Sequence, residues 1–342
     1  MYRSPPYTPF KKLLLLVLLA VVSRASASSL FEDDSVLEVS LSGPLSSLFE
    51  EEDHRRELPF LLRANGVEHS IKVRVRGNSR KRVCSFPPLR LEFAGGETTQ
   101  TIFAGQDKLK LVTHCRESDA AQQDTLEEYA AYRIFNVISD VSYKVRLLHI
   151  TYTDTDSLLD ETSFKRYGFL IESATGLAER VGGTPVHAAG VSPRSYDSQQ
   201  AATVFVFEYL IGNTDWSLVT ANKDDTCCHN VDLFDIGSNH HYVPYDFDLS
   251  GLVNARYARP DPSVGNSRVT QRAYRGYCVS TDALKNALGD IQARRVDILD
   301  VINQLPGLSE KSIKKTKKYL DQFFSQANDV EKTARSFERR CL

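Results

Sequence analysis

Apolar and polar side chains alternate in several segments of the first half of the chain. Between residues 70 and 76 every second side chain is apolar and the others are mostly basic, which predicts a half-buried strand. The same alternation predicts strands at residues 89–93 and 109–112, and Gly77, Asn78 and Ser79 form a turn after the first strand. Two more strands are expected at residues 145–152 and 167–172. The first half is therefore predicted to be rich in β-structure.

Helical spacing replaces this alternation in other segments. Apolar residues between 124 and 138 recur at helical intervals, with Asp124 as the expected N-cap. The apolar segment 201–211 predicts a buried helix, and Ser309 is expected to cap an amphipathic helix near the C-terminus. A short strand pair, 231–236 and 242–245, lies between them. This order predicts a small β-rich lobe followed by a larger, mainly helical lobe.

The N-terminus has the organisation of a secretory signal peptide. Two lysines precede an apolar run from Leu13 to Val22, and the small residues Ala25, Ser26 and Ala27 follow it. The apolar run is too short to span a bilayer, which takes about 20 residues. We therefore expect cleavage after Ala27 and a mature protein that is exported, either periplasmic or secreted, with no membrane span.

Charge and cysteine content are consistent with an exported protein. Residues 1–27 contain four basic and no acidic residues, so the 42 basic side chains fall to 38 against 44 acidic ones, a net charge of about −6. This balance excludes a nucleic-acid partner and electrostatic docking on an anionic membrane. All six cysteines lie after residue 27, and an even number in an oxidising compartment favours disulfides.

Candidate chemical groups follow one another in an order that suits phosphoryl transfer. Such a reaction needs a carboxylate beside the acceptor, carboxylate and amide oxygens on a metal ion, and a cation on the phosphates. The chain provides them in this order: Lys110 in the third strand, Glu127 or Glu128 in the next helix, Asp215 in a loop, Asn230 before the strand pair and Asp246 after it.

Several motifs add a resemblance to a known family. RGNS at 76–79, PPLRLEF at 87–93, and the loops GNTDWS and PYDFDLSG resemble the spore coat protein H (CotH) family of atypical secreted kinases, over roughly residues 71–252. The resemblance implies a bilobal, protein-kinase-like α+β fold with a small antiparallel β lobe and one helix. It also implies transfer of phosphate from ATP, with Mg²⁺ or Mn²⁺, to a protein hydroxyl.

The resemblance further implies roles for individual residues. Asp215 takes the catalytic role and Asp246 the metal-binding role, with Asp248 as a second acid. The expected nucleotide-binding residues are Arg76, Asn78, Ser79, Arg90, Lys110, Glu128 and Glu172.

Three assignments stay open in the sequence. Asn222 and Asn230 compete for the metal-binding asparagine because an acidic, cysteine-bearing insertion separates them, and we prefer Asn230 since it directly precedes a strand. Lys110 is the preferred phosphate-binding cation by chain order, although Arg76 or Arg90 could replace it. We expect Glu128 rather than Glu127 to face Lys110.

The strand order also predicts disulfides. Cys84 lies between two predicted strands and Cys115 just after the third, so the two can meet at one end of the sheet. Cys278 is expected to pair with Cys228 or its neighbour Cys227.

We divide the chain into a signal peptide (1–27), an N-terminal extension (28–66), a β-rich lobe (67–173) and a mainly helical lobe (174–342) that carries the catalytic and metal-binding loops. Two alternative functions remain: a catalytically silent CotH-like binding or assembly module, and a transferase that moves the nucleotidyl (AMP) group.

Overall fold

The computed structural model describes residues 1, 30–51, 53, 55–77, 79–94, 98–156, 162–188, 196–218 and 228–342 of the 342-residue chain. The expected signal peptide after Met1, Asn78 and Asn222 lie outside the described residues. The predictions made for them stay predictions.

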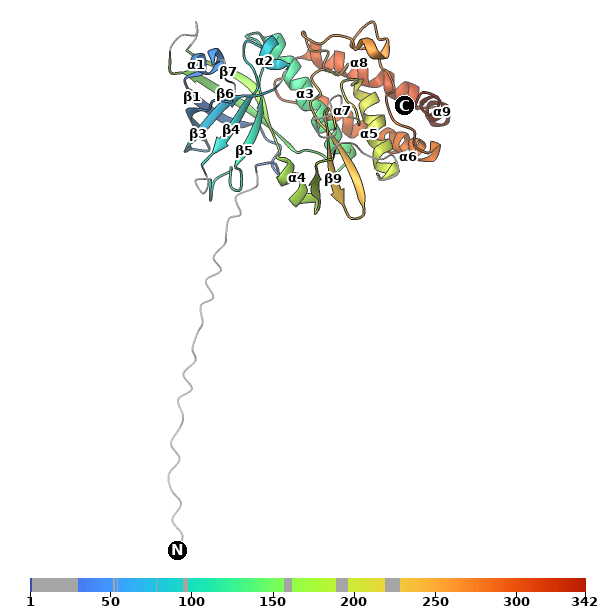
Figure 1. Ribbon diagram of the computed structural model, residues 1–342, viewed down its shortest axis with the longest axis horizontal. Coiled ribbons are helices and arrows are strands. Elements are labelled where there is room, and N and C mark those ends of the chain that lie inside the picture. Colours follow the sequence, from blue (N-terminus) through green and yellow to red (C-terminus); the bar gives the residue numbers. More distant parts are fainter. Residues whose placement is uncertain are drawn as a thin grey trace.

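Seven strands form a closed barrel in the first half of the chain (Figure 1). They are β1 (Leu37–Gly43), β2 (Leu58–Ala64), β3 (Val67–Val75), β4 (Leu89–Phe93), β5 (Lys108–Val112), β6 (Val145–Asp154) and β7 (Ser163–Ile171). Their order around the barrel is β1-β2-β3-β4-β5-β7-β6. Alternate side chains, such as Leu89, Leu91 and Phe93 of β4, are buried in one apolar core.

The predicted bilobal, kinase-like fold with a small antiparallel β lobe is wrong. Residues 30–66 are not an extension, because they supply β1 and β2 and the short helix α1 (Leu45–Glu50). β1 pairs in parallel with β6 along its whole length, from Leu37 opposite Leu148 to Gly43 opposite Asp154. This one parallel ladder closes a sheet whose other neighbours are antiparallel.

The helix α3 (Asp119–Ile138) lies between the barrel and the helical half of the chain (Figure 1). It begins five residues before the predicted start, because the Ser118 hydroxyl rather than Asp124 caps it by accepting the Ala121 N–H. Glu127 and Glu128 are both buried, as expected for a helix that is covered on two sides.

The second half contains a small sheet and most of the helices. The sheet has the order β10-β9-β8 and consists of β8 (Thr184–Val186), β9 (Val231–Ile236) and β10 (Asn239–Pro244). The main helices are α5 (Ser198–Ile211), α6 (Thr281–Ala293), α7 (Arg295–Asn303), α8 (Glu310–Ala327) and α9 (Val330–Glu338). Short elements complete the fold: α2 (Arg80–Val83), α4 (Ala174–Val181) and the 3₁₀ turn η1 (Pro262–Val264). The predicted helix in α5 and the Ser309 cap of α8 are confirmed.

Two disulfides lie wholly within the described residues. The predicted Cys84–Cys115 bond is confirmed, with a Cα–Cα distance of 4.6 Å. The predicted partner of Cys278 is wrong, because Cys278 is bonded to Cys341 and so ties the segment before α6 to the C-terminus. Cys228 is also in a disulfide. These bonds fit an exported protein, since disulfides persist in oxidising compartments.

No helix in the described part of the chain has the length and apolar composition needed to cross a membrane.

Candidate functional site

The β9–β10 hairpin brings two predicted site residues to the same end of the small sheet. Asn230 directly precedes β9 and Asp246 follows β10 by two residues, and the Tyr245 N–H donates to the Asn230 carbonyl at 3.0 Å. Both Asn230 and Asp246 have a positive φ, of 54° and 63°. A backbone conformation of this kind persists only where surrounding contacts enforce it. One such contact is the hydrogen bond from the Asp246 N–H to the Tyr132 hydroxyl at 2.9 Å.

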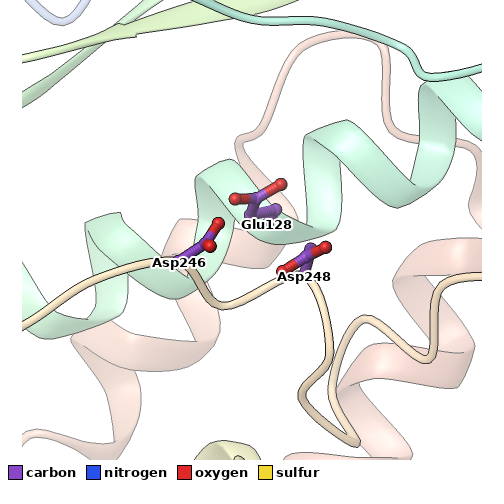
Figure 2. A group of neighbouring side chains, drawn as sticks. All are labelled: Glu128, Asp246 and Asp248. Atoms are coloured by element: carbon purple, nitrogen blue, oxygen red, sulfur yellow. The ribbon is translucent and has the colours of Figure 1, made fainter. Parts of the chain in front are cut away.

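Three carboxylates meet beside this hairpin end. Glu128 comes from α3, whereas Asp246 and Asp248 come from the segment after β10 (Figure 2). One oxygen atom from each lies within 4.8 Å of the others. Glu128 and Asp248 are buried, whereas the Asp246 side chain is 43% exposed. We call Glu128, Asp246 and Asp248 the acidic triad.

Arg80, the first residue of α2, neutralises part of this charge. Its guanidinium donates to Glu128 at 2.7 Å, to Asp246 at 2.9 Å and to Asp248 at 2.9 Å. Burial raises the pKa of Glu128 and of Asp248, and Arg80 opposes this rise in both. Although burial also acts against its own charge, the surrounding carboxylates hold the pKa of Arg80 well above its ordinary value. Arg80 is therefore a permanent cation inside the acidic triad.

Three further cations lie on the barrel, and two of them, Arg76 and Lys110, are attracted to Asp246. Arg90 and Lys110 are opposite each other on β4 and β5, and Arg76 follows β3. Burial lowers the pKa of Lys110, and repulsion from Arg76 lowers it further, while attraction to Asp232 and Asp246 opposes both. Burial likewise lowers the pKa of Arg76, against attraction to Asp246.

These cations are poorly neutralised within the described residues. Asp246 is ion-paired with Arg80 and not with these three cations. The Lys110 ammonium lies 5.1 Å from the centre of the Tyr245 ring. The buried Arg90 Nε atom has no hydrogen-bond partner among the described residues. A cluster of partly desolvated cations attracts anions.

A second polar cluster lies in the loop after α5. The Asp215 carboxylate contacts the His229 Nε2 atom at 3.0 Å and accepts a hydrogen bond from the Asn230 side-chain amide at 3.0 Å. The Asn230 amide also donates to the Asp215 carbonyl oxygen at 2.7 Å. The hydrogen bond to Asp215 raises the pKa of His229, and the more distant Asp246 carboxylate acts in the same direction. We call Asp215, His229 and Asn230 the Asp215 cluster.

Buried residues hold this loop in place. Trp216 packs on Phe205 of α5 with 5.6 Å between the ring centres, as expected for a packing anchor. The Asn213 side chain accepts the Asp215 N–H at 3.0 Å. The position of the Asp215 carboxylate is thus set by neighbours on both sides.

The glutamates Glu128, Glu127 and Glu172 contact cations other than Lys110. Glu128 contacts Arg80 instead of Lys110, and Glu127 contacts Lys315 of α8 at 2.6 Å. Glu172 accepts hydrogen bonds from Arg180 at 2.9 Å and from the Lys144 N–H at 3.0 Å. It lines a separate cleft of about 740 Å³.

Ser79 lies at the start of α2, and its side chain makes no capping hydrogen bond. It is exposed, beside Arg80 in the chain but outside the hydrogen bonds of the acidic triad.

Sequence reasoning missed three residues of the site. Arg80 directly follows the RGNS motif but belongs to the basic segment 80–82, which has the appearance of a solvated surface. His229 follows a cysteine pair and was not predicted to contact Asp215. Tyr257, whose hydroxyl donates to Asp248 at 2.8 Å, carries no recognisable sequence signal.

Comparison with models of known protein families gives no match, and comparison with curated protein sequences gives none either.

Proposed function

We propose that this chain is an exported phosphotransferase that uses ATP with Mg²⁺ or Mn²⁺ to phosphorylate a hydroxyl group of a protein. The observation that carries the proposal is the convergence of Asp246, Asn230 and Asp215 at one hairpin end. The barrel cations Arg76 and Lys110, which form no ion pair with any of the described residues, are attracted to Asp246. Acids for a metal ion, a base for the acceptor and cations for phosphate are the parts that this reaction needs. The resemblance of RGNS and PYDFDLSG to the CotH family supports the same reaction.

The donor atoms suit a hard divalent cation. Carboxylate and amide oxygens are the ligands that Mg²⁺ and Mn²⁺ prefer. Asp246 would hold the ion with its more exposed carboxylate, and Asp248 would be a second ligand. The Asn230 Nδ2 atom donates to Asp215, which leaves the Oδ1 atom as the available ligand. A bound cation would neutralise charge on the phosphates of ATP.

The remaining groups act on the acceptor and on the phosphates. Asp215 is partly exposed, so its carboxylate can accept the proton of an acceptor hydroxyl. His229 and Asn230 hold that carboxylate in one orientation. Lys110, with Arg76 or Arg90, would bind the phosphate oxygens, since Lys110 and Arg76 are attracted to Asp246 and Arg90 lies opposite Lys110.

One observation favours the catalytically silent binding module instead. Arg80 already supplies a positive charge to all three carboxylates of the acidic triad, so the triad can be stable without a metal ion.

Isotope transfer separates the candidate functions. Incubation with ATP labelled at the γ position should label an acceptor protein, or the chain itself, in the presence of Mg²⁺ or Mn²⁺. Label from the α position alone would mean nucleotidyl transfer. If neither label is transferred to any acceptor, the binding module is the better description.

Calorimetric titration tests the assignment of the metal ligands. Asp246→Ala should lose metal-dependent ATP binding, whereas Asp248→Ala should weaken it less. Unchanged ATP affinity of Asp246→Ala in the presence of Mg²⁺ would contradict the assignment.

A further inference from the structure

Arg80 is held by a short segment that has little freedom to move. It begins the four-residue helix α2, and the Cys84 N–H donates to the Arg80 carbonyl at 2.8 Å. Directly after this turn, Cys84 is bonded to Cys115. The disulfide therefore fixes the far end of the single turn that carries the arginine.

The same disulfide is tied to the segment that leads to Glu128. Cys115 lies four residues before α3, and its carbonyl accepts the Phe86 N–H at 2.9 Å. The Thr113 hydroxyl donates to the Phe86 carbonyl at 3.0 Å. Residues 80–86 are thus attached covalently and by hydrogen bonds to the start of the helix that supplies the triad glutamate.

Little space remains around the Arg80 guanidinium on the side that faces Cys115 and Tyr257. Arg80, Cys115, Glu128 and Tyr257 line a cavity of only about 10 Å³. This volume is about that of the smallest cavity that can hold one water molecule. Arg80 therefore cannot withdraw from the acidic triad in this direction unless residues 80–84 move.

We infer that Arg80 is an intramolecular competitor for the divalent cation, and that the Cys84–Cys115 disulfide holds it in the acidic triad. This inference rests on the cation site of the proposed function. The guanidinium is hydrogen-bonded to one oxygen atom of each triad carboxylate, and two of these carboxylates are the proposed metal ligands. Arg80 and a metal ion would therefore compete for the same carboxylates. A covalent restraint raises the effective concentration of the tethered group, and loosening it favours the competing ligand.

Titration with Mn²⁺ alone, followed by the electron paramagnetic resonance signal of the free ion, tests this competition. Arg80→Gln should bind Mn²⁺ at least about tenfold more tightly than the wild type, because a like charge about 4 Å from the ion has been removed. The double variant Cys84→Ser/Cys115→Ser keeps Arg80 and should bind roughly threefold or more tightly, through the lower effective concentration.

The second disulfide provides the matched control. Cys278→Ser/Cys341→Ser also removes one disulfide, but it is not attached to residues 80–84, and its Mn²⁺ affinity should equal that of the wild type. Adding Asp246→Ala to Arg80→Gln should abolish the gain, which places the bound ion at the triad.

The outcomes separate the two proposals. Equal Mn²⁺ affinity of the wild type, Arg80→Gln and Cys84→Ser/Cys115→Ser would overturn the competition while leaving the cation site in place. No Mn²⁺ binding by any of them would overturn the cation site and, with it, this inference. If Arg80→Gln does not fold, the two cysteine variants decide the question between them.

Discussion

The acidic triad with Arg80 and the Asp215 cluster are both built from charged side chains, but they differ in solvent access. The side chains of Arg80, Glu128 and Asp248 are 6%, 3% and 5% exposed, whereas those of Asp215 and His229 are 37% and 55% exposed. Buried charges must be paired and hydrogen-bonded because desolvation is costly, whereas exposed ones can exchange partners with little loss. The first arrangement therefore ties the halves of the chain together, and the second leaves the Asp215 carboxylate partly open to solvent.

Stability should depend strongly on the buried arrangement. Removing one partner of a buried ion pair leaves an uncompensated charge and costs about 3–5 kcal/mol. We expect Arg80→Leu to lower the free energy of unfolding by about this amount, as measured by urea denaturation. Arg63→Leu breaks a pair with Glu68 in which both side chains are exposed and is the matched control, with a loss of less than about 1 kcal/mol. Equal losses would mean that burial does not distinguish the two pairs.

The buried Glu208 in α5, which is close enough to the Asp215 cluster to feel its charge, should make the free energy of unfolding depend on pH. Burial raises the pKa of Glu208 in α5 well above its ordinary value of 4.5, the Asn213 amide opposes this rise and the Asp215 carboxylate adds to it. The folded state then binds a proton that the unfolded chain has already lost. The free energy of unfolding therefore falls as pH rises from the ordinary value toward the raised one.

Glu208→Gln removes this titration while it preserves the size of the side chain. We expect it to raise the free energy of unfolding at pH 7, where the native carboxyl group must be kept protonated, and to raise it by less at pH 5. Urea denaturation at the two pH values measures the difference. A gain that is the same at both would show that Glu208 does not titrate in this window.

Turnover, unlike stability, should depend on the exposed cluster. Asp215→Asn preserves size and most hydrogen bonding, so the melting temperature should stay near that of the wild type. Loss of a general base should lower transfer from γ-labelled ATP by at least about 100-fold. Asp235→Asn, which alters another aspartate–histidine pair on the β9–β10 hairpin, is the control and should transfer normally. A stable Asp215→Asn protein with wild-type transfer would refute the catalytic role.

The smallest expected effect concerns His229. Its pKa is raised by the hydrogen bond to Asp215, so its charged form stabilises the folded state below the ordinary pKa of 6.5, and this contribution is lost as pH rises through the raised value. Since the pair is exposed, His229→Gln should lower the free energy of unfolding at pH 5.5 by less than about 1 kcal/mol, and not at pH 9. A loss that persists at pH 9 would point to packing instead of charge.

Much of the local structure could be predicted because its cause is local. The alternation in β3, β4 and β5 reflects one buried face of each strand, and the apolar spacing in α3 and α5 reflects helices that are buried on more than one side. The Cys84–Cys115 bond followed from the positions of three neighbouring strands. The proximity of Asn230 and Asp246 could be predicted because the two residues flank one strand pair, whereas their metal-binding roles stay predictions.

The closure of the barrel and the composition of the acidic triad depended on tertiary structure. β1 pairs with β6 across more than 100 residues, and no local pattern in residues 30–66 specifies that partner. Arg80 belongs to a basic segment whose sequence is typical of a surface, but it is buried because Glu128, Asp246 and Asp248 approach it from 48, 166 and 168 residues away. Periodicity records which face of an element is buried, whereas the partner of a buried charge depends on which distant segments the fold brings together.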